Sequence, residues 1–67
     1  MKIDGVVVGF DDHRGDGWIE SVDGSWYFHC VAIADGSRSV ANGLEVTGIR
    51  VVGHRGVDEV VGVRPRR

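Results

Sequence analysis

Three side chains with flat π faces stand at a spacing that could bind the bases of a nucleic acid: Trp18, Tyr27 and His29. Successive side chains of a strand point to opposite faces, so Tyr27 and His29 would share one face, with Trp18 beside them on a neighbouring strand. Exposed rings of this kind stack on unpaired bases, and phenol and imidazole groups can also hydrogen-bond a base edge. The pattern predicts a stacking surface, with the alternative that the rings only cover the outside of a sheet.

The residues of opposite parity, Ile19, Trp26 and Phe28, should face the core. Trp26 is large for such a position, so its neighbours should be small. We expect Gly9 and Gly48 to leave room for its ring. One face of this sheet is therefore predicted to be core and the other a stacking surface.

Short strands must position these rings. Eleven glycines, several of them after Asp or Asn, separate runs of β-branched residues, which is typical of strands joined by tight turns. We expect strands at about Ile3–Phe10, Gly17–Ser21, Ser25–Cys30, from Leu44 onward, and Val57–Val63. We expect turns at 11–16, 23–24 and 53–56, and a single helical turn at 31–33 before a loop that ends near residue 43.

The fourth strand has a broken alternation. Leu44 and Val46 share one parity, whereas Ile49 and Val51 share the other. A β-bulge near 47–48 would turn all four side chains inward, because one extra residue reverses the alternation. The alternative is a strand that is buried on both faces.

Five short strands, with a long connection between the third and the fourth, predict an all-β fold: a five-stranded antiparallel Greek-key barrel of the oligonucleotide-binding (OB) type. The 67 residues are expected to form one domain over 1–67, since a sandwich of seven or more strands needs a longer chain. Three arginines near the end predict a frayed basic tail at 64–67.

The charge distribution argues against tight binding of phosphate. The net charge is −2, and residues 1–30 hold two basic and six acidic side chains, a local balance of −4. Nucleic-acid affinity depends largely on the neutralisation of phosphates, so the half of the chain that carries the rings should repel a nucleic acid at long range.

Other features point to a cytoplasmic protein without membrane contact. The chain has no apolar run near the roughly 18 residues of a membrane span and no signal segment at its start. Cys30 is the only cysteine, so no internal disulfide is possible. No His or Cys pair has the spacing of a structural zinc site, and a barrel this small is filled by its own core. We expect no metal, no cofactor and no enzymatic activity.

Two motifs together resemble those of the cold-shock domain family. Residues 14–19, Arg-Gly-Asp-Gly-Trp-Ile, are similar to the family's Lys-Gly-Phe-Gly-Phe-Ile, and residues 26–29, Trp-Tyr-Phe-His, are similar to its Val-Phe-Val-His. Residues 5–10 also match the family's opening Gly-x-Val-x-Trp-Phe, except at its tryptophan. The resemblance covers about residues 5–63, and it implies an OB fold that binds single-stranded RNA or DNA.

The departures from the family pattern lie on the binding face. Val8 and Gly9 stand where the family has a lysine and a stacking tryptophan, and Asp16 and Cys30 stand where it has aromatic residues. A small residue near Ser37 replaces a loop phenylalanine. Several stacking groups are therefore missing.

The binding residues that the resemblance implies are Phe10, Arg14, Trp18, Tyr27, His29 and Arg38. Trp18, Tyr27 and His29 would stack on bases. Arg14 and Arg38 would each contact a phosphate, with the alternative that each pairs with a nearby aspartate.

The expected function is weak, largely sequence-independent binding of single-stranded nucleic acid, in a chaperone-like role. Stacking is worth about 1–3 kcal/mol per base, so the missing aromatic residues should weaken binding by about two to four decades. The alternative is a protein-interaction or dimerisation module on the same fold. Val8, Phe10, Trp18 and Tyr27 would then form an apolar surface rimmed with acid.

Overall fold

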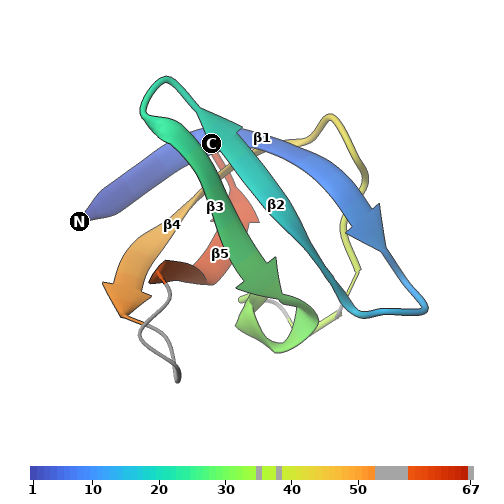
Figure 1. Ribbon diagram of the computed structural model, residues 1–67. Coiled ribbons are helices and arrows are strands. Elements are labelled where there is room, and N and C mark those ends of the chain that lie inside the picture. Colours follow the sequence, from blue (N-terminus) through green and yellow to red (C-terminus); the bar gives the residue numbers. More distant parts are fainter. Residues whose placement is uncertain (35, 38, 53–57, 67) are drawn as a thin grey trace.

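Five strands close into a β-barrel in the order β1-β2-β3-β5-β4 in the computed structural model (Figure 1). The structure describes residues 1–34, 36–37, 39–52 and 58–66. Its strands are β1 Lys2–Asp11, β2 Asp16–Ser21, β3 Gly24–His29, β4 Glu45–Val52 and β5 Asp58–Pro65, with a short 3₁₀ helix, η1, at Cys30–Ala32. The predicted all-β barrel is confirmed, and η1 lies one residue before the expected helical turn. The Greek-key connection and the OB assignment stay predictions.

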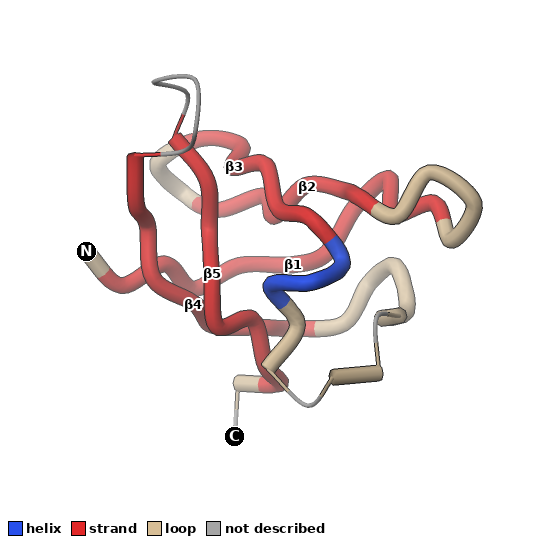
Figure 2. Tube along the Cα trace, turned by 90° about the horizontal axis from the view of Figure 1, so that it is seen from below, coloured by secondary structure: helices blue, strands red, loops and turns tan. Residues whose placement is uncertain are grey.

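The barrel closes because β1 pairs with a different neighbour at each end. Its first half pairs with β4 and its second half with β2, both antiparallel, and the two pairings meet at Val6. β5 pairs antiparallel with β4 and meets β3 in parallel at Tyr27 and Glu59. Nothing in the sequence pattern predicts this parallel contact. Figure 2 shows η1 at the end of β3, where the chain leaves the barrel for the long loop toward β4.

The core consists of inward-facing side chains from all five strands and from the end of η1. Among the described residues the buried apolar side chains are Ile3, Val7, Ile19, Phe28, Ile33, Val46, Val60 and Val63. Trp26 is half-buried and packs against this cluster, and its Nε1 donates to Ser21 Oγ at 3.1 Å. The inward parity predicted for Ile19, Trp26 and Phe28 is thus confirmed.

Two β-bulges bend the strands, and each contains a glycine in the left-handed region. Val8 lies opposite Trp18 but Asp11 lies opposite Asp16, so β1 has one extra residue here, next to Gly9 at φ 63°. The second shift lies between Thr47 and Ile49 of β4, and there the extra residue belongs to β5, next to Gly62 at φ 65°. Left-handed glycines are what such bulges require, and they increase the local twist of a strand.

A second glycine lies opposite each bulge, on the unbulged strand. A Cβ atom at Gly17 would lie 2.8 Å from Phe10 Cα. A Cβ at Gly48 would clash with the buried Val60 side chain and lie 3.0 Å from the Val61 carbonyl oxygen. The strands therefore approach too closely at both places for any side chain. The idea that Gly9 and Gly48 make room for Trp26 is wrong, because the atoms nearest to them belong to Trp18 and to β5.

The predicted bulge near 47–48 is present in the pairing of β4 with β5, but the expectation that it turns Ile49 and Val51 inward is wrong. Because the extra residue lies on β5, β4 keeps its alternation, with Val46 and Gly48 buried. Ile49 and Val51 consequently point outward, with 48% and 37% of their surface exposed. A strand buried on both faces is excluded by the same exposures.

The C-terminal residues are ordered by β4 rather than frayed. β5 continues to Pro65, and the Arg66 backbone N–H donates to the Glu45 carbonyl oxygen at 3.0 Å. The Arg66 guanidinium also pairs with the Glu45 carboxylate at 2.7 Å. The expected frayed tail is therefore wrong for 64–66. The predicted hairpin loop at 53–56 and the start of the last strand at Val57 lie outside the described residues.

No helix among the described residues is long and apolar enough to cross a membrane.

We predict that Gly17→Ala destabilises the barrel by up to about 3 kcal/mol, because the new methyl group meets backbone atoms of Phe10 that cannot move cheaply. Gly62→Ala is the control. Its Cβ meets open space, so it should cost only the roughly 1 kcal/mol of a left-handed alanine. Urea denaturation measures both, and equal losses would contradict the steric role of Gly17.

Candidate nucleic-acid interface

The outer surface of β2 and β3 carries a square of four side chains. Trp18 of β2 lies opposite Tyr27 of β3, and Asp16 lies opposite His29 in the next outward-facing row. The three predicted rings therefore do come together on one face. The fourth corner is a carboxylate. We call these four residues the outer square.

The two larger rings of the outer square support each other edge to face. The ring centroids of Trp18 and Tyr27 are 5.5 Å apart and their planes are 74° apart. This T-shaped contact lets the positive edge of one ring meet the negative face of the other. Trp18 keeps 43% of its surface exposed, so its indole remains accessible to a ligand.

His29 is exposed, and one of its ring nitrogens is used within the fold. Its Nδ1 accepts a hydrogen bond from the Val31 backbone N–H at 3.3 Å and thereby caps η1. Cys30 Sγ lies 3.8 Å from the same nitrogen. With Nδ1 accepting, the proton of the neutral ring is on Nε2, where it can donate to an acceptor on a base.

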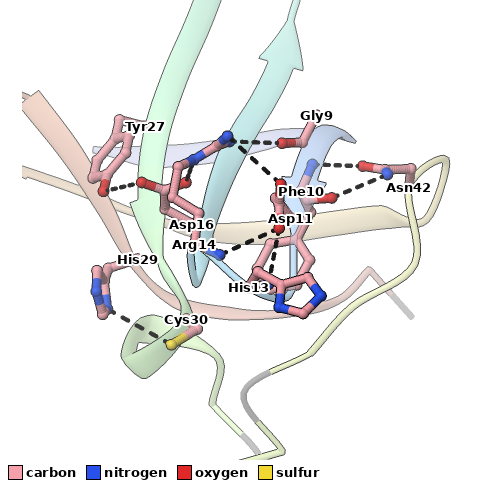
Figure 3. A network of polar contacts seen from close by, with 10 residues as sticks. All are labelled: Gly9, Phe10, Asp11, His13, Arg14, Asp16, Tyr27, His29, Cys30 and Asn42. Carbon is pink, nitrogen blue, oxygen red and sulfur yellow. Dashed lines mark hydrogen bonds and ion pairs between the residues drawn. The ribbon is translucent and has the colours of Figure 1, made fainter.

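Asp16 joins two predicted binding residues in one network (Figure 3). Its Oδ1 accepts from Arg14 Nε, and its Oδ2 accepts from the Tyr27 hydroxyl at 2.8 Å. Arg14 also donates to the Gly9 carbonyl oxygen at 3.2 Å and lies 3.9 Å from the Asp11 carboxylate. The structure thus pairs Arg14 with aspartates, which was the alternative to a phosphate contact.

These contacts shift the pKa values of the groups involved. The hydrogen bond from Arg14, followed by that from Tyr27, holds the pKa of the Asp16 carboxyl below its ordinary value. The hydrogen bond to Asp16, with burial second, raises the pKa of the Tyr27 phenol. Asp16 is therefore ionised at neutral pH. Its pairing stabilises the fold above about pH 4, and that stabilisation is lost as the pH falls through the lowered pKa.

Phe10 lies apart from the outer square. The bulge at Gly9 turns its side chain inward, and its ring stacks on that of Phe28 with centroids 5.7 Å apart and planes 9° apart. Asn42 holds the bulge from the loop side: its Oδ1 accepts from the Phe10 N–H at 2.8 Å, and its Nδ2 donates to the Phe10 carbonyl at 3.3 Å. Phe10 therefore packs partly against the core.

Acidic groups border the outer square. Glu59 lies beside Tyr27 through the parallel contact with β5, and Glu20 follows Trp18 on the same face of β2. Arg14 is the one arginine or lysine that the described residues place in hydrogen-bond contact with the square. Arg38, the other predicted phosphate contact, lies outside the described residues. The charged side chains at and around the outer square therefore make the site neutral or acidic, and not basic.

Two residues of this region were missed by reasoning from the sequence: Asp11 and Asn42. The Asp11 carboxylate begins the turn by accepting from the backbone N–H groups of His13 and Arg14, at 2.8 and 3.2 Å. An aspartate at the start of a turn is a recognised signal for this contact. Nothing comparable indicates Asn42, because it lies 32 residues from Phe10 along the chain.

No protein-family model matches this chain, and no curated protein matches it.

We predict that Asp16→Asn lowers the pKa of Tyr27 toward its ordinary value of about 10, because the neutral amide no longer opposes the phenolate charge. The chain has a single tyrosine, so its phenolate absorbance against pH reports this one residue. Asp23→Asn makes the same charge change in the turn between β2 and β3 and should leave the titration unaltered. If Asp16→Asn also leaves it unaltered, the hydrogen bond between Tyr27 and Asp16 is absent in solution.

Proposed function

We propose that this protein is a cold-shock-like OB-fold protein that binds single-stranded RNA or DNA weakly, through the outer square. Trp18, Tyr27 and His29 stack on bases with little regard to sequence, and Arg14 contacts the phosphate backbone only when a phosphate displaces the Asp16 carboxylate from it. Such binding favours unpaired strands over duplexes, and so fits a chaperone of nucleic-acid secondary structure in the cytoplasm.

The observation that carries the proposal is the shared face of the three rings. Trp18, Tyr27 and His29 come from two neighbouring strands and face outward together, with the Trp18 indole 43% exposed. Every base has a π face, so a group of exposed rings binds single strands without reading their sequence.

The expected weakness follows from the charges. Counterion release drives most non-specific binding, and the guanidinium of Arg14 is already paired with Asp16. Glu59 and Glu20 add repulsion at the edges of the square. Affinity at physiological salt should therefore be about micromolar or weaker, within the usual scale of non-specific binding.

We predict saturable quenching of Trp18 fluorescence by a short oligothymidine at low salt, with affinity that falls as salt rises. Trp26→Phe makes Trp18 the only tryptophan, so excitation at wavelengths that Tyr27 does not absorb reports Trp18 alone. Fluorescence polarisation of a labelled strand should show that the Trp18→Ala protein binds about 5- to 150-fold more weakly than the native protein. This is the value of one stacking contact.

Val22→Ala is the matched surface control for Trp18→Ala, since Val22 is fully exposed at the β2–β3 turn. It should bind like the native protein. No quenching even at low salt would reject the proposal, as would equal binding by the Trp18→Ala and Val22→Ala proteins.

A second candidate function, self-association, is favoured by the outer surface of β4 and β5. Ile49 lies opposite Val61, with Val51 next to them, and all three are more than a third exposed. Lys2 flanks Ile49 on one side of this patch and Glu59 flanks Val51 on the other. A second copy related by a two-fold axis could thus pair Lys2 with Glu59 over the apolar residues. Val8 and Phe10, expected in such a surface, are partly buried.

If the protein self-associates, Ile49→Lys should shift it to monomer in sedimentation velocity, because the new charge would be buried in the contact. Val22→Lys makes the same kind of change away from the patch and should have no effect. Association through apolar contacts should also persist at high salt. A native protein that stays monomeric at millimolar concentration would remove this candidate.

A further inference from the structure

Asp16 is placed where it competes with any phosphate that approaches the outer square. Its two carboxylate oxygens accept hydrogen bonds from Arg14 Nε and from the Tyr27 hydroxyl (Figure 3). The Tyr27 ring in turn contacts the exposed Trp18 ring edge to face. A phosphate offers the same kind of anionic oxygen acceptors as a carboxylate. Asp16 therefore already fills the positions that a phosphate would fill.

The rest of the network would keep Arg14 at the square without Asp16. The Arg14 backbone is held in its turn by Asp11, and its guanidinium also donates to the Gly9 carbonyl and lies near the Asp11 carboxylate. The side chain is 55% exposed, so a ligand can reach it. Removal of the Asp16 charge would leave a guanidinium and a phenol that are positioned but less occupied.

We propose that Asp16 is an internal competitor for phosphate, which keeps the affinity of the outer square low by occupying Arg14 and Tyr27. The inference rests on the proposed function and concerns the regulation of the same site. A strand binds by displacing the carboxylate from Arg14 or by stacking without a phosphate contact. In both cases the negative charge of Asp16 opposes the backbone. The residue sets how tightly, rather than whether, the rings hold a strand.

The test compares the native protein with Asp16→Asn in binding a labelled oligothymidine at several salt concentrations. We expect the variant to bind about tenfold more tightly at low salt, the value of one charge-assisted contact. The salt dependence should steepen by about 0.7 in log affinity against log salt, which is the value of one more phosphate contact to a single strand. Asp16→Ser is a second variant that should also bind more tightly, because the short serine side chain cannot bond Arg14 and Tyr27 together.

Two controls separate competition from a general change in charge. Asp23→Asn alters the net charge equally but lies at the β2–β3 turn, outside the network, so it should raise affinity much less. In an Arg14→Gln background, Asp16→Asn should lose most of its gain, because the guanidinium that it releases is absent. A gain that survives in that background, or that Asp23→Asn reproduces, would overturn the inference.

Failure of the inference and failure of the proposed function look different. If the native protein binds, Trp18→Ala weakens binding and neither Asp16 variant strengthens it, then only the competitor role is rejected. If no protein in the set shows salt-sensitive binding, including Asp16→Asn, then the nucleic-acid function and the competitor role are both rejected. Thermal denaturation checks that each variant is folded before its affinity is compared.

Discussion

Closure of the barrel depends on places where strands come closer than side chains allow, and two of these places lie at the β-bulges. At each bulge one strand contains a left-handed glycine, Gly9 on β1 and Gly62 on β5. A glycine on the neighbouring strand leaves room for the backbone of the bulged strand. The same arrangement at both places bends strands that would otherwise leave an open sheet with unpaired edges. The bulge at Gly9 also shapes the candidate site, because it turns Phe10 into the core and brings the Gly9 carbonyl within reach of Arg14.

Much of this fold could be predicted from the alternation of side chains. Strand parity was enough to place Ile19 and Phe28 in the core and Trp18 and Tyr27 on the outside, because both hairpin strands are regular. The alternation predicted the wrong face for side chains near the two bulges, where one of the paired strands has an extra residue. A bulge reverses the alternation of its own strand only, and the sequence does not tell which of two paired strands contains it. For this reason Phe10, Ile49 and Val51 were assigned to the wrong faces.

The polar part of the site was harder to predict than the aromatic part. Asp16 was recognised as an acidic residue in an aromatic position, but its contacts depend on the register of three strands and on the shape of the 12–15 turn. The same holds for Asn42, which reaches the bulge from the distant loop. The local sequence shows which polar side chains are present, whereas the pairing of distant strands decides which of them meet. The result is a group of rings suited to stacking whose nearest cation is already paired.

The nucleic-acid interface is tested most directly by NMR, with the backbone amide and indole signals followed as a short oligothymidine is added at low salt. The two tryptophans give two indole N–H signals, one at the outer square and one bonded to Ser21. We predict that the Trp18 indole and the amides of 16–18 and 27–29 shift, while the Trp26 indole and the amides of β4 stay in place. Shifts confined to the outer surface of β4 and β5, or none at all, would contradict this account.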